Sequence, residues 1–312
     1  MNIDLLSNLA KDFYLKKMSF ADLAEKYSLS RYLVNKYLDE ARDSGIVTIS
    51  IASSLQRNHE LEQVFHKLFD IHEIAIIENG GGSTGRKNLI KFAADYIQQE
   101  IMKSSIVGTL WGTTMYEVMD HFTPTEREGL TFTQFMGENR KYKSLAGSRR
   151  MVENAAQKFS SDFITLSGPL YILDKTSRIG LIRDIAAVDA IAAAKRMNML
   201  FSGLGTLASV NSIPTWRTNI HKIFPNVNLN EVAGMCYGRP FDINGKILIH
   251  PDVDNVFGLS MLQVLRTPTR IGVIPSKFKA QSTLGALRGK FFTDVILSED
   301  VAQRILAEMN MN

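Results

Sequence analysis

Residues 19–51 constrain the fold more than any other part of this 312-residue chain. Ser19 is a preferred helix N-cap with Asp22 in the capping-box position, and apolar residues then recur at helical spacing. A short break at residues 28–30 follows, and Ser30 can cap a second amphipathic helix. Gly45 lies after this helix as a favoured residue just beyond a helix C-terminus. The pattern predicts a helix, a tight turn, a second helix and then a strand.

The second helix of this pair has a polar face typical of helices that bind in the DNA major groove. The residues expected to read base edges or contact phosphates are Ser30, Arg31, Tyr32, Asn35 and Lys36. An amphipathic helix expected over residues 3–17 and a strand expected over residues 46–51 would complete a winged helix-turn-helix. The alternative is an ordinary pair of short helices with a solvated basic face.

The rest of the chain has the pattern of a larger, separate domain. We expect a winged helix-turn-helix at 1–52, a polar linker at 53–58 and the larger domain at 59–312. In the larger domain, strand candidates alternate with helices, which predicts an α/β fold with a largely parallel sheet. Strands are expected at 73–77, 105–110, 131–136, 162–166, 199–201, 270–274 and 294–297, and helices at 148–158, 177–197, 281–287 and 299–309.

Charge and composition narrow the class of protein. The net charge of +4 is compatible with a polyanionic partner. The first 52 residues are close to neutral, so any DNA affinity must depend on how charge is distributed over their faces. A single cysteine, Cys236, excludes an intramolecular disulfide and fits a reducing cytoplasm. No apolar run approaches the roughly 18–20 residues that span a bilayer, so we expect a cytoplasmic protein with no membrane partner.

Loops that follow the expected strands are the candidate ligand sites, because ligands of open α/β sheets bind at the carboxyl ends of strands. In the loop with Gly112, Thr113 and Thr114, the glycine allows close approach of an anion to backbone amides at a helix N-terminus. The alternative is a capped strand-to-helix turn. Gly203 and Gly205 form a second, weaker anion loop.

Two further residues could contact a ligand. Lys279 follows the apolar strand at 270–274 and could reach a phosphate, although a solvated lysine is an equally simple interpretation. Asp242 could bind a sugar hydroxyl or close an Asx turn. The six histidines show no metal-ligand spacing and no acid/base pair is evident, so we predict no metal site, no cofactor and no catalytic residue.

Taken together, these motifs resemble the SorC family of bacterial transcriptional regulators of carbohydrate metabolism. The similar segments keep their order over nearly the whole chain, at 23–49, 107–114, 168–172, 203–205, 237–245 and 279–289. The resemblance implies a winged helix-turn-helix joined to a sugar-binding domain with the fold of ribose-5-phosphate isomerase and glucosamine-6-phosphate deaminase. Such regulators bind operator DNA as homodimers or homotetramers, and a phosphorylated sugar changes their affinity for it.

The resemblance also implies site residues. The family's effector phosphate is held by the loop matching Gly112, Thr113 and Thr114 and by the lysine matching Lys279, and Arg149 or Arg150 corresponds to a further arginine contact. This chain departs from the family at Met235, where many relatives have an acidic effector contact. It departs again at residues 275–276, where Pro-Ser replaces the usual Gly-Gly pair.

The expected function is therefore a sequence-specific DNA-binding regulator of a carbohydrate operon, not an enzyme. Its partners would be double-stranded operator DNA and a sugar or sugar-phosphate effector. The alternative is a phosphosugar isomerase or deaminase of the same fold with an accessory helical domain. For that chemistry, Asp242 and Glu299 are the available general bases.

Overall fold

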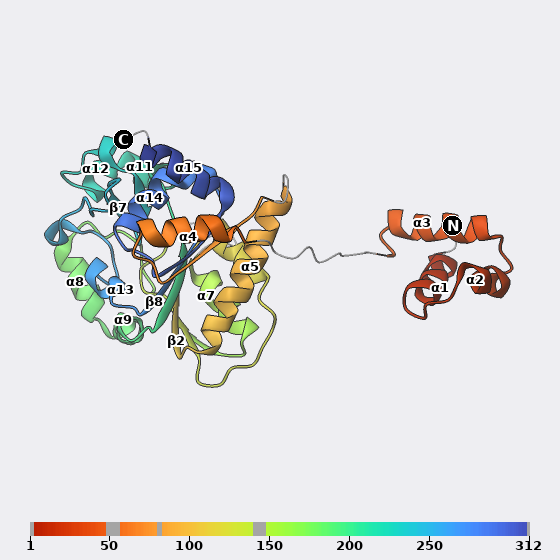
Figure 1. Cartoon of the computed structure of the whole chain (residues 1–312). Helices are drawn as coiled ribbons and strands as arrows, with labels where there is room; N and C mark the ends of the chain where they lie inside the picture. Colours follow the sequence, from red (N-terminus) through yellow and green to blue (C-terminus); the bar gives the residue numbers. More distant parts are fainter. Residues whose placement is uncertain (1–2, 48–56, 80–82, 140–147, 311–312) are drawn as a thin grey trace. The chain divides into compact units, whose positions relative to one another are not determined.

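The computed structural model describes residues 3–47, 57–79, 83–139 and 148–310. The chain divides into two compact units between Ser54 and Leu55, and each is described here by itself (Figure 1). Residues 48–51 of the expected wing strand and residues 53–56 of the expected linker lie outside the described residues. Within the described residues, no helix is both long and apolar enough to cross a membrane.

The smaller unit contains three helices: α1 (Ile3–Tyr14), α2 (Phe20–Tyr27) and α3 (Arg31–Asp43). The two caps expected from the sequence are confirmed, because Ser19 and Asp22 form a capping box on α2 and the Ser30 side chain accepts a hydrogen bond at the start of α3. Gly45, with φ +76°, follows α3 in the left-handed conformation. The helices bury a shared core of Leu6, Leu9, Ala10, Leu23, Val34, Leu38 and Ala41.

A buried carboxylate ties α1 to α2. Asp12 is 3% exposed, and its oxygens lie 2.8 Å from Lys16 Nζ and 2.6 Å from Lys26 Nζ. The Tyr27 hydroxyl also donates to Asp12, at 2.7 Å. The bonds from Lys16, Lys26 and Tyr27 hold the pKa of Asp12 far below its usual range, while burial and the bond to Asp12 raise the pKa of Tyr27 to about 12.

We expect Asp12→Asn to destabilise the three-helix unit at pH 7. A lowered folded-state pKa means that ionised Asp12 stabilises the fold above its unfolded pKa of about 3.9, and that this contribution is lost as the pH falls toward the folded pKa. Hydrogen exchange resolved by mass spectrometry should show faster exchange in α1 and α2 of the variant at pH 7. In urea titrations, the gap between the variant and the natural protein should narrow at pH 2.5; an equal gap at both pH values would contradict the assignment.

The larger unit is built on a seven-stranded sheet in the order β1-β9-β8-β5-β2-β3-β4, with every neighbouring pair parallel. The α/β fold with a largely parallel sheet is thus confirmed. The strands are β1 (Glu73–Ile77), β2 (Ile106–Thr109), β3 (Thr131–Thr133), β4 (Asp162–Ile164), β5 (Met199–Gly203), β8 (Thr269–Ile274) and β9 (Asp294–Ser298). A separate antiparallel pair joins β6 (Gly234–Cys236) to β7 (Arg239–Phe241).

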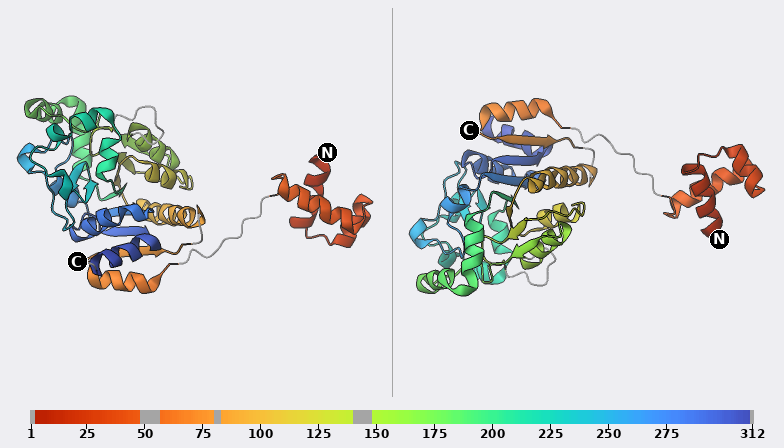
Figure 2. Two further views of the ribbon diagram at one scale, coloured as in Figure 1. Left: turned by 90° about the horizontal axis from the view of Figure 1, so that it is seen from above. Right: turned by 90° about the horizontal axis from the view of Figure 1, so that it is seen from below.

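Helices cover both faces of this sheet, as Figures 1 and 2 show. Successive side chains of a strand point to opposite faces, so Ile74 and Ile76 enter one hydrophobic core while Ala75 and Ile77 enter the other. The helices are α4 (His59–Leu68), α5 (Ser83–Met102), α6 (Thr113–Asp120), α7 (Ser148–Lys158), α8 (Lys175–Arg183), α9 (Ile185–Lys195), α10 (Leu207–Asn211), α11 (Pro214–Thr218), α12 (Ile220–Ile223), α13 (Met261–Leu265), α14 (Ala280–Arg288) and α15 (Glu299–Asn310), with 3₁₀ turns η1 (Leu229–Glu231), η2 (Pro251–Val253) and η3 (Lys277–Lys279).

The prediction of a single helix over residues 177–197 was wrong, because two helices, α8 and α9, cover this segment. Asp184 has extended backbone angles and its side chain accepts a hydrogen bond from Ala186 N at 2.9 Å, so it ends α8 and caps α9. The alanine-rich sequence is apolar on every side, and its periodicity therefore did not reveal the break.

The first described residues of the larger unit, which we expected in the linker, are attached to the edge of the sheet. Arg57 forms an isolated bridge with Ile77, and its guanidinium lies 2.7 Å from Glu62 and 2.8 Å from Glu73. Asn58 caps α4, and its side-chain amide donates to Glu299 at 2.9 Å. The connection between the two units therefore joins the larger one beside the carboxyl end of β1.

Candidate ligand-binding site

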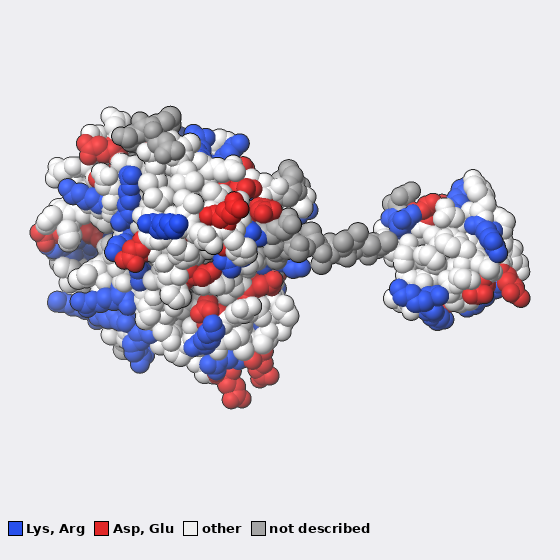
Figure 3. All heavy atoms as spheres, in the orientation of Figure 1, with Lys and Arg blue, Asp and Glu red and all other residues white. Residues whose placement is uncertain are grey.

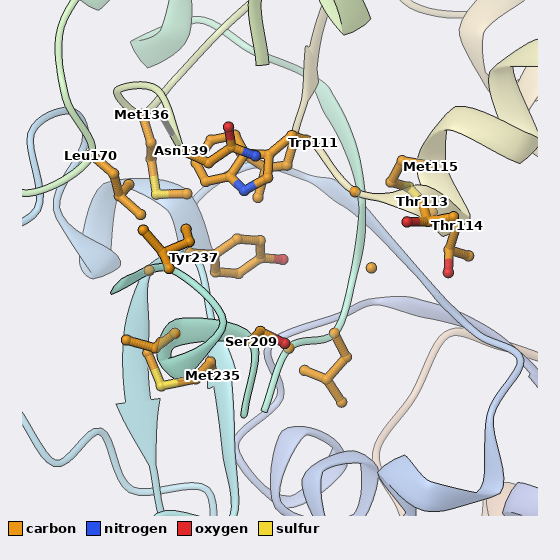
Figure 4. Close-up of a pocket in the computed structure, with 18 of the residues that line it drawn as sticks. Trp111, Thr113, Thr114, Met115, Met136, Asn139, Leu170, Ser209, Met235 and Tyr237 are labelled. Carbon is orange, nitrogen blue, oxygen red and sulfur yellow. The ribbon is translucent and has the colours of Figure 1, made fainter. Parts of the chain in front are cut away.

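A cavity of about 340 Å³ opens at the carboxyl ends of β2, β3, β5 and β8 (Figure 4). The chain leaves β2 toward β3 and β4 on one side, and then returns to place β5 on the other side of β2. This is the point at which a doubly wound sheet reverses its strand order, where the loops after neighbouring strands separate and leave room for a ligand. The volume lies near the lower end of the range for small-molecule sites.

One end of the cavity is suited to an anion. Gly112, with φ +138°, is the N-cap of α6 and supplies no side-chain hydrogen bond to it. The first amides of α6, from Thr113 onward, have no acceptor within the helix and carry the positive end of its dipole. A Cβ at Gly112 would meet no atom within 4 Å, so the space in front of these amides is open.

Lys279 adds a positive charge to this end. It closes η3, lines the cavity and is half-buried. Burial, reinforced by the nearby positive charge of Arg86, lowers the pKa of Lys279. Arg86 is itself paired with Glu117 at 2.7 Å, whereas the structure shows no ion-pair partner for Lys279 among the described residues. A partly desolvated ammonium beside helix amides favours binding of a phosphate or carboxylate.

The β6–β7 hairpin forms another wall. Its two-residue turn places Tyr237 at φ 49° and Gly238 at φ 75°, the left-handed pair of a type I′ hairpin. A tyrosine in this conformation costs on the order of 1–3 kcal/mol and needs support from its surroundings. The support comes from edge-to-face contacts with Phe135 and Phe292 and from a hydrogen bond donated to Phe291 O at 3.0 Å.

A buried guanidinium holds the hairpin in place. Arg239 is 1% exposed; it pairs with Asp254 at 2.7 Å and donates to the carbonyl oxygens of Tyr237 and Leu259, both at 2.9 Å. Every one of these partners is fixed within the fold. The arginine is therefore structural, and it orients the turn that faces the cavity.

We expect Arg239→Met to destabilise the larger unit by about 3–5 kcal/mol, because it leaves Asp254 without its buried partner. Urea unfolding followed by circular dichroism measures the loss. The matched control is Arg266→Met on the exposed end of α13, which should change stability by no more than about 0.5 kcal/mol. Equal effects of the two substitutions would show that the buried pair does not support the fold.

The structure places most of the predicted effector residues around the one cavity. Gly112, Thr113, Thr114, Gly203, Gly205 and Lys279 all line it. Asp242 does not: its Oδ1 accepts from Asn244 N at 2.9 Å and from Lys246 N at 2.8 Å, so it closes a turn. Arg149 lies in the first turn of α7, and its side chain falls outside the described residues.

The sequence did not identify several other lining residues as site residues, namely Met136, Asn139, Leu170, Tyr171, Ser209, Trp216 and Tyr237. Most are apolar or aromatic and come from short elements without a clear periodicity. One usable signal was Tyr237-Gly238 between two short apolar runs, which is a hairpin pattern.

The proposed DNA-contacting residues lie along α3. Arg31, Tyr32 and Lys36 are exposed, with 76% of Tyr32 accessible to solvent. Asn35 is exposed as well and donates to Asp39 at 3.1 Å. Ser30 accepts from Leu33 N at 3.2 Å and thereby fixes where α3 begins. Lys and Arg side chains lie close to Asp and Glu on the visible face of this unit (Figure 3).

Two other kinds of site receive no support from the part of the chain that the structure describes. It contains no group of three or more His, Cys, Asp or Glu side chains placed to hold a metal ion. Burial raises the pKa of the Cys236 thiol well above its usual value, which makes this cysteine a poor nucleophile.

Comparison with known proteins gives the chain a family. Residues 53–307 match the family model "Putative sugar-binding domain". The Escherichia coli transcriptional regulator YjhU is 24% identical over 95% of this chain and 92% of its own length. The deoxyribonucleoside regulator of Bacillus subtilis is 23% identical over 96% of both chains.

A solved structure shows the same fold. The full-length sorbitol operon regulator SorC of Klebsiella pneumoniae superposes with a TM-score of 0.78 at 18% identity, covering 98% of this chain and 99% of that one. All three of these similar proteins are named as regulators.

Proposed function

The chain belongs to the SorC-type family of transcriptional regulators that carry this sugar-binding domain, and on that premise we propose that it controls a carbohydrate operon in response to a phosphorylated sugar. The observation that carries the proposal is the cavity at the strand ends, which both the open N-terminus of α6 and Lys279 line. The three-helix unit is the proposed DNA-binding part. We place its action in the cytoplasm, where the operator is.

The proposed DNA contact is the exposed face of α3. Arg31 and Lys36 supply positive charge, and Tyr32 and Asn35 supply groups that can contact bases or phosphates. Asp39 holds Asn35 in the free chain, so this amide would have to exchange partners to read a base. The nearly neutral charge of the unit makes these few exposed cations the main source of electrostatic attraction to DNA.

The proposed effector contact begins with the phosphate. The amides of α6, the hydroxyls of Thr113 and Thr114 and the ammonium of Lys279 would hold its oxygens, while the sugar extends toward the other cavity walls. Binding would favour one arrangement of the DNA-binding units by differential contacts and so shift operator affinity. Two hydrogen bonds support coupling between the sheet and the start of the larger unit. The Asn58 side-chain amide and the Asn79 backbone N–H both donate to Glu299, at 2.9 and 3.3 Å, beside the carboxyl ends of β1 and β9.

We further propose that the working form is a homodimer or homotetramer. A single recognition helix covers only one half-site, and regulators with this motif pair two of them on a palindromic operator. Exposed apolar side chains on α8 and α9 support self-association: Ile179, Leu181, Ile185 and Val188, with Ile185 88% accessible. An exposed cluster of this kind is typical of a surface that a second protein covers.

The alternative of an isomerase or deaminase receives no support from this site. Asp242 and Glu299 were the carboxylates available for acid/base chemistry. Asp242 closes a turn, Glu299 binds Asn58 and Asn79, and neither lines the cavity. The chain is a regulator, in keeping with the proteins it resembles.

We expect Arg31→Ala to weaken binding to a DNA site that the full chain selects from a random-sequence pool. Loss of a base contact should cost about 1–3 kcal/mol of binding free energy. Lys36→Ala should reduce the slope of the logarithm of the binding constant against the logarithm of salt concentration by about one. Fluorescence anisotropy over a series of salt concentrations measures both effects. Lys11→Ala, which removes an exposed lysine from α1, is the matched control. Unchanged affinity in both α3 variants would sink the recognition-helix assignment.

We expect Lys279→Gln to weaken phosphorylated-sugar binding roughly tenfold to a hundredfold, because it removes a charged hydrogen-bond donor from the anion end. DNA affinity without the sugar phosphate should not change. Thermal shifts of the full chain with a panel of sugar phosphates measure binding, and anisotropy measures the DNA response. The control is Lys277→Gln, which removes an exposed lysine two residues away. A response lost equally in both variants would argue against a specific phosphate contact.

A further inference from the structure

A second cavity, of about 340 Å³, lies on the larger unit beside α8, α9 and α13 (Figure 1). It is separate from the proposed effector cavity, because the two share no described lining residue. One part of its lining is aliphatic and consists of Ile179, Ile182, Ile191, Val256 and Leu259, and the other part is charged. The second cavity is therefore suited to a small ligand that is itself partly apolar and partly charged.

The charged part of the second cavity carries an excess of positive charge. Four cations line it against two carboxylates, which gives a net charge of +2: Lys175, Arg178, Lys195 and Arg239 against Asp252 and Asp254. The buried ion pair cancels the charges of Arg239 and Asp254. Lys175 and Lys195 have no ion-pair partner among the residues that the structure describes, and Asp252 is exposed. This balance favours an anionic ligand.

Arg178 is the lining residue with unused hydrogen-bond donors. It is 7% exposed, and its Nη1 donates to Ile172 O and, at 3.2 Å, to Asn255 Oδ1. Its Nε and Nη2 donate to no acceptor among the described residues, and neither atom is sealed from solvent. Because a guanidinium removed from bulk water needs acceptors for its N–H groups, the cavity beside Arg178 is a place where a ligand oxygen gains affinity.

The other buried arginine of the second cavity shows the contrast. In Arg239 all three nitrogens donate, to Asp254, Tyr237 O and Leu259 O. Asp174 lies near Arg178, and hydrogen bonds from Ser177 and the charge of Arg178 lower the pKa of Asp174. No hydrogen bond joins Asp174 to Arg178, however, and Asp174 does not line the cavity. Arg178 therefore keeps donors for a ligand, whereas Arg239 does not.

The shape of the free guanidinium edge points to a carboxylate. Nε and Nη2 lie side by side on a planar group, and together they match the two oxygens of one carboxylate. The aliphatic part of the lining would then contact a hydrocarbon chain, with a gain for each buried methylene group. A phosphate is the other common anion for such an edge, but inorganic phosphate has no hydrocarbon for the aliphatic part.

We propose that the second cavity binds a short aliphatic carboxylate. Its two oxygens accept from Nε and Nη2 of Arg178, Lys175 and Lys195 supply further positive charge, and its chain packs on the isoleucines of α8 and α9. This site does not depend on the proposed phosphate contact at Thr113 and Lys279, so the two ligands can be bound together.

Titrations of the full chain followed by saturation-transfer NMR test the ligand class. Pentanoate is compared with pentanamide, which has the same carbon chain without the charge, with acetate, which lacks most of the chain, and with inorganic phosphate. We expect pentanoate to bind about tenfold more tightly than pentanamide, because charged hydrogen bonds are lost in the amide. Acetate and phosphate should also bind at least tenfold more weakly, because neither reaches the aliphatic part.

Variants of the cations test the location. Arg178→Lys keeps the charge but removes the paired donors, and it should weaken pentanoate binding about tenfold. The double variant Lys175→Gln/Lys195→Gln changes two exposed side chains, should weaken binding to a similar extent, and serves as the test if Arg178→Lys does not fold. Lys67→Gln, which removes an exposed lysine from α4, is the control and should leave binding unchanged.

The contrary outcomes are distinct. Equal binding of pentanoate and pentanamide, or phosphate binding as tight as that of pentanoate, overturns the ligand class. Pentanoate binding that is lost in Lys279→Gln but kept in the double variant places the carboxylate in the effector cavity and overturns the second site, while the proposed phosphate contact stands. Absence of saturable pentanoate binding also overturns the proposal; loss of self-association in the double variant would then assign these cations to a contact with a second copy of the chain.

Discussion

The ion pair between Arg239 and Asp254 is the interaction on which the shape of the cavity depends. A guanidinium this deeply buried persists only because a carboxylate and backbone carbonyls satisfy it. The hydrogen bonds of Arg239 fix the β6–β7 hairpin turn. This turn holds Tyr237 in a left-handed conformation that a tyrosine would otherwise avoid. The buried ion pair thereby positions Tyr237, which lines the cavity.

The parallel sheet explains why the cavity and the contacts of Asn58 lie along the same edge. All seven strands end at the same side, so the loop at Gly112, the loop at Gly203 and the segment leading to Lys279 converge on one cavity. The attachment of the preceding segment uses the same side, through Asn58 and Glu299. The proposed effector site and Asn58, among the first described residues of the larger unit, therefore lie along the same edge of the sheet.

Much of this could be predicted from the sequence, and for clear reasons. The caps at Ser19 and Ser30 depend on local chemistry, and the strand at 73–77 has buried apolar residues in succession, so both were found at their observed positions. The break at Asp184 was missed because an alanine-rich stretch has no polar face to mark it. The role of Asp242 stayed open, because the same aspartate can bind a ligand or its own backbone, and only the fold decides which.

The cavity wall was the least predictable part, since it is assembled from short elements far apart in the chain. Met136, Leu170 and Met235 meet there only because the turns around them pack together.

The assembly of the cavity has a practical consequence. Trp111 and Trp216 are the only two tryptophans in the chain, and both line the cavity. Because both tryptophans lie in the larger unit, we expect the intrinsic tryptophan emission of this protein to report cavity occupancy without any added label.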